Sequence, residues 1–396
     1  MTTHDMDLLG PIPEALRSAT GGVASIVTPA GDRMWLVRDY ALSRFVLTDR
    51  RFSRSDAVTA QAPKLLDAEP VPESIMSMDG EEHARLRRTT AGAFTTHRIA
   101  AMAPFIERLT DELLDRMAVS EAPVDFVSTV AAHLPLTVLC ALLGVPEEDS
   151  DRFKGWVEVL FDIASGPETQ YRRRLELARY ITRLLGDKRR DPQEDLLSTL
   201  LGEQEAGRLS KTETLTMGLT LLMAGFQSTI GQIGLMVLSI LSDPPTAAQL
   251  RERPELVPHA VEEAMRLNPA SLISFPRIAL EPVRLGDVVV GTGEAVIVSF
   301  LDANRDGKVF EDPMRPALED RNPGHIAFGH GAHRCLGAPL ATLQLRIVLT
   351  RLLHRFPTLR LAAVPEPVTW KEGLATRGLS RLMVAWDTER TGEGAR

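Results

Sequence analysis

The chain has 396 residues, of which 44% are apolar and 25% charged, so its composition excludes a disordered or fibrous protein. The formal net charge of −8 gives no sign of a basic surface that holds nucleic acid. Two cysteines, Cys140 and Cys335, are too few for a disulfide framework, a four-cysteine zinc site or an iron–sulfur cluster. Acidic residues stand at the N-terminus where a secretory signal needs basic ones, so we expect a reduced, cytoplasmic protein.

Helical periodicity dominates the first two-thirds of the chain. Apolar residues recur at helical spacing and predict helices over 42–49, 82–94, 99–117, 127–143, 152–164, 169–188 and 193–201. The segment 53–79 contains three prolines and little periodicity. Loops of this length usually act as functional lids or are disordered.

A stretch without charge lies near the middle of the chain. The 29 residues between Glu213 and Asp243 are enough to cross a bilayer. Hydroxyl and amide side chains are spread through the stretch, however, and acids rather than basic residues bound it. We therefore predict a long helix that is buried at the centre of a soluble protein, and no membrane partner.

The last third mixes helices with short strands. It predicts a helix over 257–267, strands at 283–285, 288–290 and 295–300, an irregular segment over 308–325, a final helix over 336–355 and strands near 381–386. We expect frayed termini at 1–10 and 387–396. No repeat and no βαβ alternation is present. The prediction is a mainly α fold with a minor β part, in a single domain over residues 1–396.

The segment from Phe328 to Leu340 carries the most chemical information. Gly329 and Gly331 permit a tight turn. Cys335 then stands at the start of a predicted helix, because Pro339 is acceptable only in a first turn. Free amide groups and the positive end of the helix dipole favour a thiolate there.

Three interpretations of Cys335 remain open on the residues alone. It is a buried structural cysteine, a nucleophile with His330 or His333 as its base, or the single thiolate ligand of a haem iron. The glycines before the thiol favour close approach of the backbone to a large flat group, which points to the haem.

The segment resembles the haem-binding signature of cytochromes P450, Phe-x-x-Gly-x-His/Arg-x-Cys-x-Gly, at Phe328, Gly331, His333, Cys335 and Gly337. The resemblance covers nearly the whole chain and is closest to soluble bacterial members. It implies the cytochrome P450 fold, haem b (iron protoporphyrin IX) as cofactor, and Cys335 as the axial ligand of its iron.

Other motifs of the family follow in the right order. Glu263-Ala-Met-Arg266 resembles the family's Glu-x-x-Arg helix, in which both charges share one helical face. The resemblance implies a third member of this structural cluster, Arg315 or Arg321, without saying which. It also implies that four residues hold the two haem propionates, namely His83, Arg87, Arg277 and His333.

The charge-free stretch departs from the family pattern. The family usually has Ala/Gly-Gly-x-Asp/Glu-Thr-Thr/Ser there, and its acid–alcohol pair relays protons to bound O2. Here Gly225 is kept, Gln227 stands at the acid position, and Ser228 and Thr229 follow. Glutamine can hold a water but does not titrate near neutrality. We expect proton delivery through Ser228 and ordered water, or through a group on the substrate.

Two interpretations of Gln227 are left open. Either it is neutral drift with a water in place of the carboxylate, or the enzyme does something other than simple hydroxylation. The Gln-Ser-Thr stretch is similar to that of family members that couple aromatic rings, including those that dimerise tryptophan-containing cyclic dipeptides.

The family's substrate contacts are carried over by analogy to Met223, Phe226, Leu272, Phe275 and Thr376, and to the 55–79 loop. They are mostly apolar, which favours a hydrophobic small molecule. The resemblance implies oxidation of such a compound, aromatic by preference, in bacterial secondary metabolism, by hydroxylation or by C–C/C–N coupling. It also implies O2 and two electrons from a ferredoxin and its reductase. The alternatives are a conventional hydroxylase or epoxidase of a macrolide, terpenoid or fatty-acid-like substrate, and a haem sensor or carrier without turnover.

Overall fold

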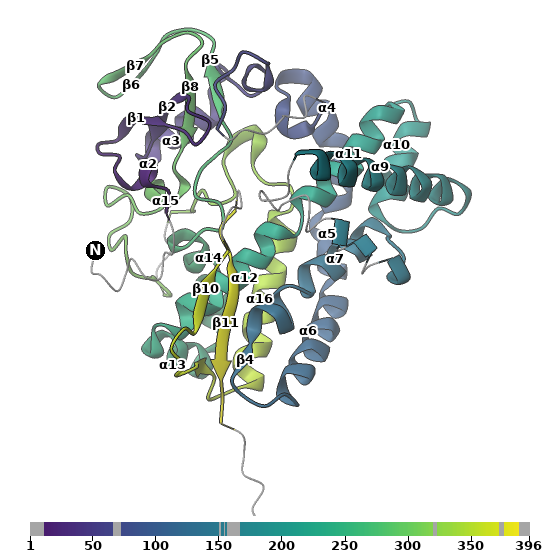
Figure 1. The fold of residues 1–396 in the computed structure, drawn as a ribbon, viewed down its shortest axis with the longest axis vertical. Coiled ribbons are helices and arrows are strands. Elements are labelled where there is room, and N and C mark those ends of the chain that lie inside the picture. The colour runs from purple at the N-terminus through teal and green to yellow at the C-terminus, as the bar shows by residue number, and fades with distance from the viewer. Residues whose placement is uncertain are drawn as a thin grey trace, which may run out of the picture.

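The computed structural model describes residues 12–65, 73–149, 152–153, 155–156, 167–319, 323–371 and 376–387. Helices make up most of this part of the chain, and small sheets lie along one side of them (Figure 1). The predicted class, mainly α with a minor β part, is confirmed. The termini expected to fray fall almost wholly outside the described residues, as does most of the helix predicted over 152–164.

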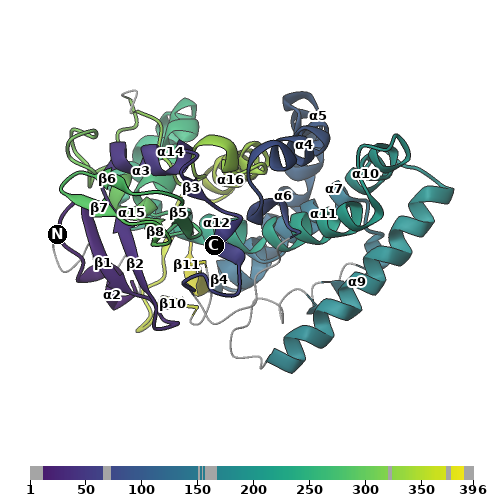
Figure 2. The same ribbon diagram turned by 90° about the horizontal axis from the view of Figure 1, so that it is seen from above.

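The helices follow the predicted order. Their bounds are α2 Glu14–Arg17, α3 Tyr40–Thr48, α4 Gly80–Ala91, α5 Thr96–Ala101, α6 Ala103–Ala118, α7 Leu134–Leu143, α9 Pro167–Arg190, α10 Leu196–Glu205, α11 Lys211–Ala224, α12 Gln227–Leu241, α13 Pro244–Glu252, α14 Val257–Leu267, α15 Phe300–Ala303 and α16 Ala338–Arg355. Short 3₁₀ turns stand at Asp56–Val58, Ile75–Ser77, Gly92–Phe94, Glu147–Asp149, Pro254–Leu256 and Gly331–His333. α9 lies at the outer edge of the molecule, away from α14 and α16 (Figure 2).

Two predicted helices are interrupted at prolines. The helix expected over 99–117 is divided at Met102 into α5 and α6, because Pro104 stands in the first turn of α6 and cannot continue the preceding helix. The helix expected over 127–143 begins as a π-helical segment, Val127–Ala131, and α7 starts only beside Pro135.

The largest sheet has five strands in the order β1 (Val23–Val27), β2 (Arg33–Val37), β8 (Ala295–Val298), β5 (Arg277–Ala279) and β3 (Phe52–Ser53). Its pairs are antiparallel except β2–β8. The sequence interpretation missed β1 and β2, which form a hairpin ahead of the first strong helix. The sheet pairs Ser53 with Ile278, and so brings the segment after Phe52 beside Arg277.

Two smaller sheets complete the strands. β6 (Val283–Leu285) and β7 (Val288–Val290) are the two strands predicted at these residues, and they pair as an antiparallel hairpin. β11 (Leu379–Ala385) lies at the centre of the other sheet, and its partners are β4 (Val124–Asp125), β9 (Arg360–Leu361) and β10 (Val368–Trp370).

The charge-free stretch forms two helices in line. Taken together, Lys211–Leu241 has a mean hydropathy of 1.5 in its most apolar window and 72% of that window is buried, as expected for a core helix. α11 ends at Ala224 and α12 begins at Gln227, so the single long helix is broken at Gly225 and Phe226. α12 packs against α14 and α16 near the centre of the molecule (Figure 1).

One large hydrophobic cluster reaches from Ile99 on α5 to Trp386 after β11 and includes α12, α14 and α16. It contains residues of α14, which carries the Glu263–Arg266 motif, and of α16, which follows the segment 328–337 directly. The single domain over residues 1–396 stays a prediction.

Candidate functional site

The Cys335 loop is a series of tight turns held by backbone hydrogen bonds. The amide of Gly329 donates to Ile326 O (2.8 Å), that of Arg334 to Gly331 O (3.1 Å), and that of Cys335 to Phe328 O (2.8 Å). Gly331 has φ +74°, and a Cβ on it would stand 2.8 Å from Leu47 O on α3. Glycine is therefore required where the loop crosses α3.

The Cys335 thiol lies just before the start of α16. Burial raises its pKa above the ordinary value, whereas the amides of Gly337 and Ala338 donate to Sγ and, with the charges of Arg334 and Arg87, act in the opposite direction. The residue nevertheless has exposed surface, so protein surrounds the thiol without covering it. Cys140, by contrast, is buried in an apolar cluster. Donors on Sγ prepare the thiol to act as a thiolate ligand, because metal binding replaces the proton.

Side chains from four separate segments form a cationic cluster. The rings of His83, on α4, and His333, in the Cys335 loop, lie 4.1 Å apart between centroids. Burial, followed by the charges of His333 and Arg87, lowers the pKa of His83 to about 4. Burial also lowers the pKa values of His333 and of Arg277, which stands on β5.

Two members of this cluster, Asp79 and Arg54, were missed in the sequence. Asp79 Oδ1 lies 3.3 Å from His333 Nε2, and its Oδ2 accepts from Ser53 Oγ (3.0 Å) and the Ser55 amide (2.8 Å). Although burial opposes it, these donors hold the pKa of Asp79 well below its usual range. Arg54 is buried beside them. Both residues stand outside the matched motifs, and the sequence flagged the region only through the segment 53–79, which contains them, and through His83, four residues after Asp79.

The cluster has more donors than acceptors. Asp79 is the one carboxylate that acts on His83, His333, Arg54 and Arg277 in the described part of the chain. Arg277 donates weakly to Phe52 O (3.4 Å), and its Nε is buried with no hydrogen-bond partner among the described residues. A buried guanidinium of this kind favours a ligand that carries carboxylates.

The break between α11 and α12 collects the residues expected to handle protons. A Cβ on Gly225 would stand 2.7 Å from Leu221 O and 2.9 Å from Leu139 Cδ1, so only glycine fits. Gln227 and Ser228 are half-buried and Thr229 is buried, all in the first turn of α12. Helix ends leave backbone groups without helical partners, which makes the break a polar point in an apolar core.

Glu263 and Arg266 form a buried pair on α14. Arg266 donates to Glu263 Oε1 (2.9 Å) and Oε2 (2.8 Å), and to the backbone oxygens of Asn304 (3.0 Å), Pro313 (2.9 Å) and Arg315 (2.7 Å). The pair thus holds the segment that precedes the Cys335 loop. Of the two candidates for a third member, Arg315 meets the pair through its backbone oxygen, while its guanidinium is exposed and lies 3.8 Å from Asp312. Arg321 lies outside the described residues.

The residues expected to contact substrate divide into two groups. Met223 and Thr376 are half-buried, and Phe275 is 59% exposed. Phe226 is only 2% exposed and packs in the cluster of α7 and α10, whereas Leu272 is 7% exposed and packs beside β8. Phe226 and Leu272 therefore pack in hydrophobic clusters, and their role as substrate contacts stays a prediction. An apolar side chain in a sequence does not show whether it faces the core or a binding site.

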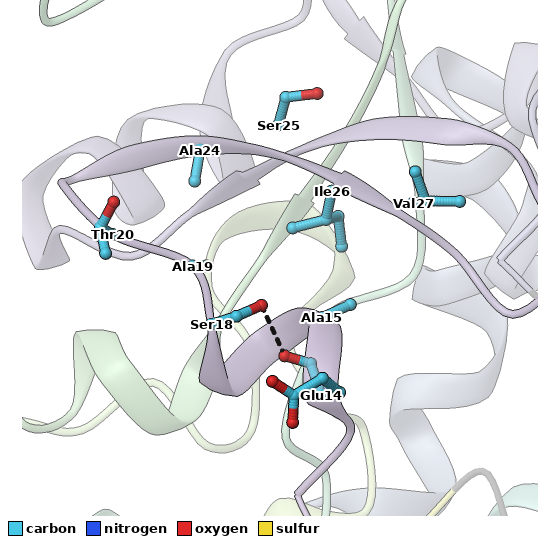
Figure 3. A pocket seen from close by; sticks show the side chains of 9 residues that line it. All are labelled: Glu14, Ala15, Ser18, Ala19, Thr20, Ala24, Ser25, Ile26 and Val27. Carbon is cyan, nitrogen blue, oxygen red and sulfur yellow. Dashed lines mark hydrogen bonds between the residues drawn. The ribbon is translucent and has the colours of Figure 1, made fainter.

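A separate hollow of about 520 Å³ lies between α2 and β1 (Figure 3). Small side chains and hydroxyls line it, including Ala15, Ala24 and Ser25, and the Ser18 hydroxyl donates to Glu14 O (2.8 Å). None of the residues that the sequence predicted for a site lines this hollow.

The family model for cytochrome P450 matches residues 145–377. Nocardicin C N-oxygenase of Nocardia uniformis subsp. tsuyamanensis is 42% identical over 362 residues, covering 90% of this chain and 91% of the relative. Mycinamicin IV hydroxylase/epoxidase of Micromonospora griseorubida is 38% identical, covering 97% and 96%. This chain belongs to the cytochrome P450 family. A solved P450 described as having biaryl coupling reactivity is 35% identical, with a TM-score of 0.88 and coverage of 97% and 98%.

The chain is thus a P450 monooxygenase of the type found in bacterial secondary metabolism, and the predicted P450 fold is confirmed. Enzymes of this family carry haem bound through a thiolate, use O2 and bind hydrophobic substrates. The residues present fit haem. The accessible thiol matches the iron ligand, and the cationic cluster with its buried Arg277 Nε matches two propionates. The oxygenase relatives leave the sensor or carrier alternative without support.

Proposed function

We propose that Cys335 is the axial ligand of the haem iron and that Arg277, His333, His83 and Arg87 hold the propionates. The observation that carries this proposal is the accessible thiol, with two amides on its sulfur, beside a cluster whose cations exceed its acids. When bound, haem supplies the reduction of O2 with two electrons. Phe328, 5.8 Å from the His325 ring, and Gly337 shape the loop on the sulfur side.

The break before α12 supplies protons in this proposal. Gly225 lets Leu139 of α7 approach the break closely, and Ser228 with Thr229 offers hydroxyl groups that both donate and accept. Gln227 orients a water through its amide and does not titrate. Ser228 therefore carries the last transfer to oxygen, and water or a substrate group replaces the acid found in most family members.

The reaction supported best is insertion of one oxygen atom into a mostly apolar small molecule. The support comes from two relatives that are an N-oxygenase and a hydroxylase/epoxidase, at 42% and 38% identity. Oxidative coupling of aromatic rings is the second candidate. Gln227 at the acid position and the likeness to a P450 with biaryl coupling reactivity favour it.

A ferredoxin and its reductase are the proposed electron donors. The exposed side of the Cys335 loop carries Arg334, and Arg44 of α3 donates to His330 Nε2 (3.2 Å) in the same loop. These groups are basic in a chain whose net charge is −8. An acidic ferredoxin is attracted to such a patch, and the attraction weakens as salt rises. The cytoplasmic location stays a prediction.

The iron ligand is tested by the spectrum of the reduced protein with carbon monoxide. We expect the red-shifted Soret band of thiolate ligation in the wild type and in Cys140→Ala, and its loss in Cys335→Ala with unchanged helix content. A band typical of histidine ligation in the wild type would falsify the assignment of Cys335.

The reaction class is tested by turnover in ¹⁸O₂ with mass spectrometry, after a ligand screen that follows the spin state of the haem. Oxygen insertion leaves one labelled atom in the product. Coupling leaves none and joins two rings, and that outcome would replace the first candidate with the second.

A further inference from the structure

Arg54 is a buried arginine that ties two distant segments together. Its side chain is 5% exposed. Nε and Nη2 both donate to Met76 O, at 3.0 and 2.7 Å, and Nη1 donates to Pro276 O. The carbonyls it joins stand 200 residues apart in the sequence. A planar guanidinium is the side chain that spans two carbonyls in this way.

The first of these segments is the end of the 55–79 loop. Met76 lies in the 3₁₀ turn Ile75–Ser77. The Ser74 hydroxyl, just before it, is 3.2 Å from the Thr220 hydroxyl of α11 in the buried interior. The turn is therefore fixed on one side to the helix that leads to the Gly225 break, and on the other side to Arg54.

The second segment leads into β5. Pro276 follows Phe275, whose ring lies 5.0 Å from the Arg54 guanidinium carbon. Phe275 is 59% exposed, so Arg54 supports part of the ring while the rest is open to a ligand. A cation against a ring adds about 0.5–2 kcal/mol, depending on how far the pair is desolvated.

We propose that Arg54 is a positioning residue that locks the Ile75–Ser77 turn to the Phe275–Arg277 segment, so that two walls of the substrate chamber move as one. Phe275 is then the fixed surface on which an apolar or aromatic substrate rests. The assignment of these walls to the substrate rests on the proposed function, whereas the lock itself rests on the contacts of Arg54.

The charge state of Arg54 supports this role. Burial and the nearby charge of Arg277 lower its pKa to about 10, against the opposing charge of Asp79. The guanidinium therefore stays protonated at neutral pH and makes charge-assisted hydrogen bonds to both carbonyls. A lysine keeps the charge but presents one nitrogen in place of a fork.

The lock is tested by hydrogen exchange of the haem-loaded full chain, comparing wild type with Arg54→Met and Arg54→Lys. We expect exchange to rise about tenfold in peptides covering 73–79 and 272–278 together, in both variants. Arg51→Met is the matched control, because Arg51 is partly exposed and pairs with Asp49 and Glu281. It should leave both peptides unchanged. Unchanged exchange in either peptide of the Arg54 variants overturns the lock.

Binding of azoles to the iron adds a second readout. Imidazole needs no chamber wall and should bind all variants within about twofold, whereas 4-phenylimidazole should bind both Arg54 variants about tenfold more weakly. Full rescue by Arg54→Lys shows that charge alone matters and overturns the proposal. If Arg54→Met does not fold, the same exchange and azole-binding measurements on Arg54→Lys decide the proposal. The carbon monoxide spectrum of the wild type separates failure of the haem–thiolate assignment from failure of the lock.

Discussion

Replacing Glu263 by glutamine tests how strongly the buried pair on α14 stabilises the protein. Both side chains of the pair are nearly inaccessible. Glu263 accepts from Nε and Nη2 of Arg266 and from the Ala317 amide, at 2.8–3.1 Å. Each of these partners is a donor. A glutamine therefore has to turn its NH₂ group toward a donor, and it also removes the charge that balances Arg266.

The size of the effect follows from this environment. Removing one partner of a buried ion pair costs about 3–5 kcal/mol. An unfolding entropy of about 2.1 cal/mol/K per residue gives about 0.8 kcal/mol/K for 396 residues, so a loss of about 4 kcal/mol lowers Tm by about 5 °C.

The assay is thermal unfolding of the haem-loaded protein, followed by far-UV circular dichroism and by the Soret band. Both signals are needed because proteins with a bound cofactor often depart from two-state unfolding. Glu255→Gln is the control, since Glu255 is exposed and pairs only with Arg253 among the described residues. We expect it to shift Tm by less than about 1 °C. If Glu263→Gln shifts Tm no more than the control does, the buried charge is not what stabilises this region.

Three further predictions concern other parts of the molecule. Gly144→Ala places a Cβ on a residue with φ +74° and against the Asp195 carboxylate, and we expect the free energy of unfolding in urea to fall by at least about 1–3 kcal/mol. The control Gly202→Ala, which adds a Cβ in open space, should not lower it. Burial of Glu213 raises its pKa, but hydrogen bonds from Arg85 and Ser210 outweigh burial and lower the pKa below 4.5, so the stability that Glu213 contributes is complete above that pH and is lost on acidification. Glu213→Gln should therefore flatten the fall of Tm below pH 4.5. An unchanged slope of Tm against pH in the acid range contradicts this. Ser228→Ala should divert more electrons to peroxide than Gln227→Ala, measured as peroxide formed per NADH consumed with a bound substrate; equal coupling in both variants would remove Ser228 from the proton route.

Local patterns predicted those elements whose determinants are adjacent in the sequence. The helix over 257–267 has the predicted bounds because an amphipathic stripe and Pro258 at its start mark it directly. α16 starts at Ala338, two residues later than predicted, because Cys335, Leu336 and Gly337 still belong to the loop that places the thiol. The break at Gly225 was not predicted, because Gly218, Gly231 and Gly234 stand in the same apolar stretch inside unbroken helices.

Features that depend on tertiary contacts were not predictable in the same way. Arg54 and Asp79 meet Arg277 and His333 only because β3 pairs with β5 and the Cys335 loop crosses α3. The sequence likewise did not show that Phe226 packs beside α7 and Leu272 beside β8. The direction in which an apolar side chain points is fixed by its neighbours in space.

The cationic cluster buries the guanidinium groups of Arg54 and Arg277 in a protein of net charge −8, beside two histidines whose lowered pKa values favour the neutral ring. Burial lowers the pKa values of Arg54, Arg277, His83 and His333, so each of them stabilises the fold less than it would if it were exposed or paired. Asp79 alone does not balance the two guanidinium groups. A ligand with two carboxylates restores the balance, and because it binds the folded state only, its binding free energy adds to folding stability.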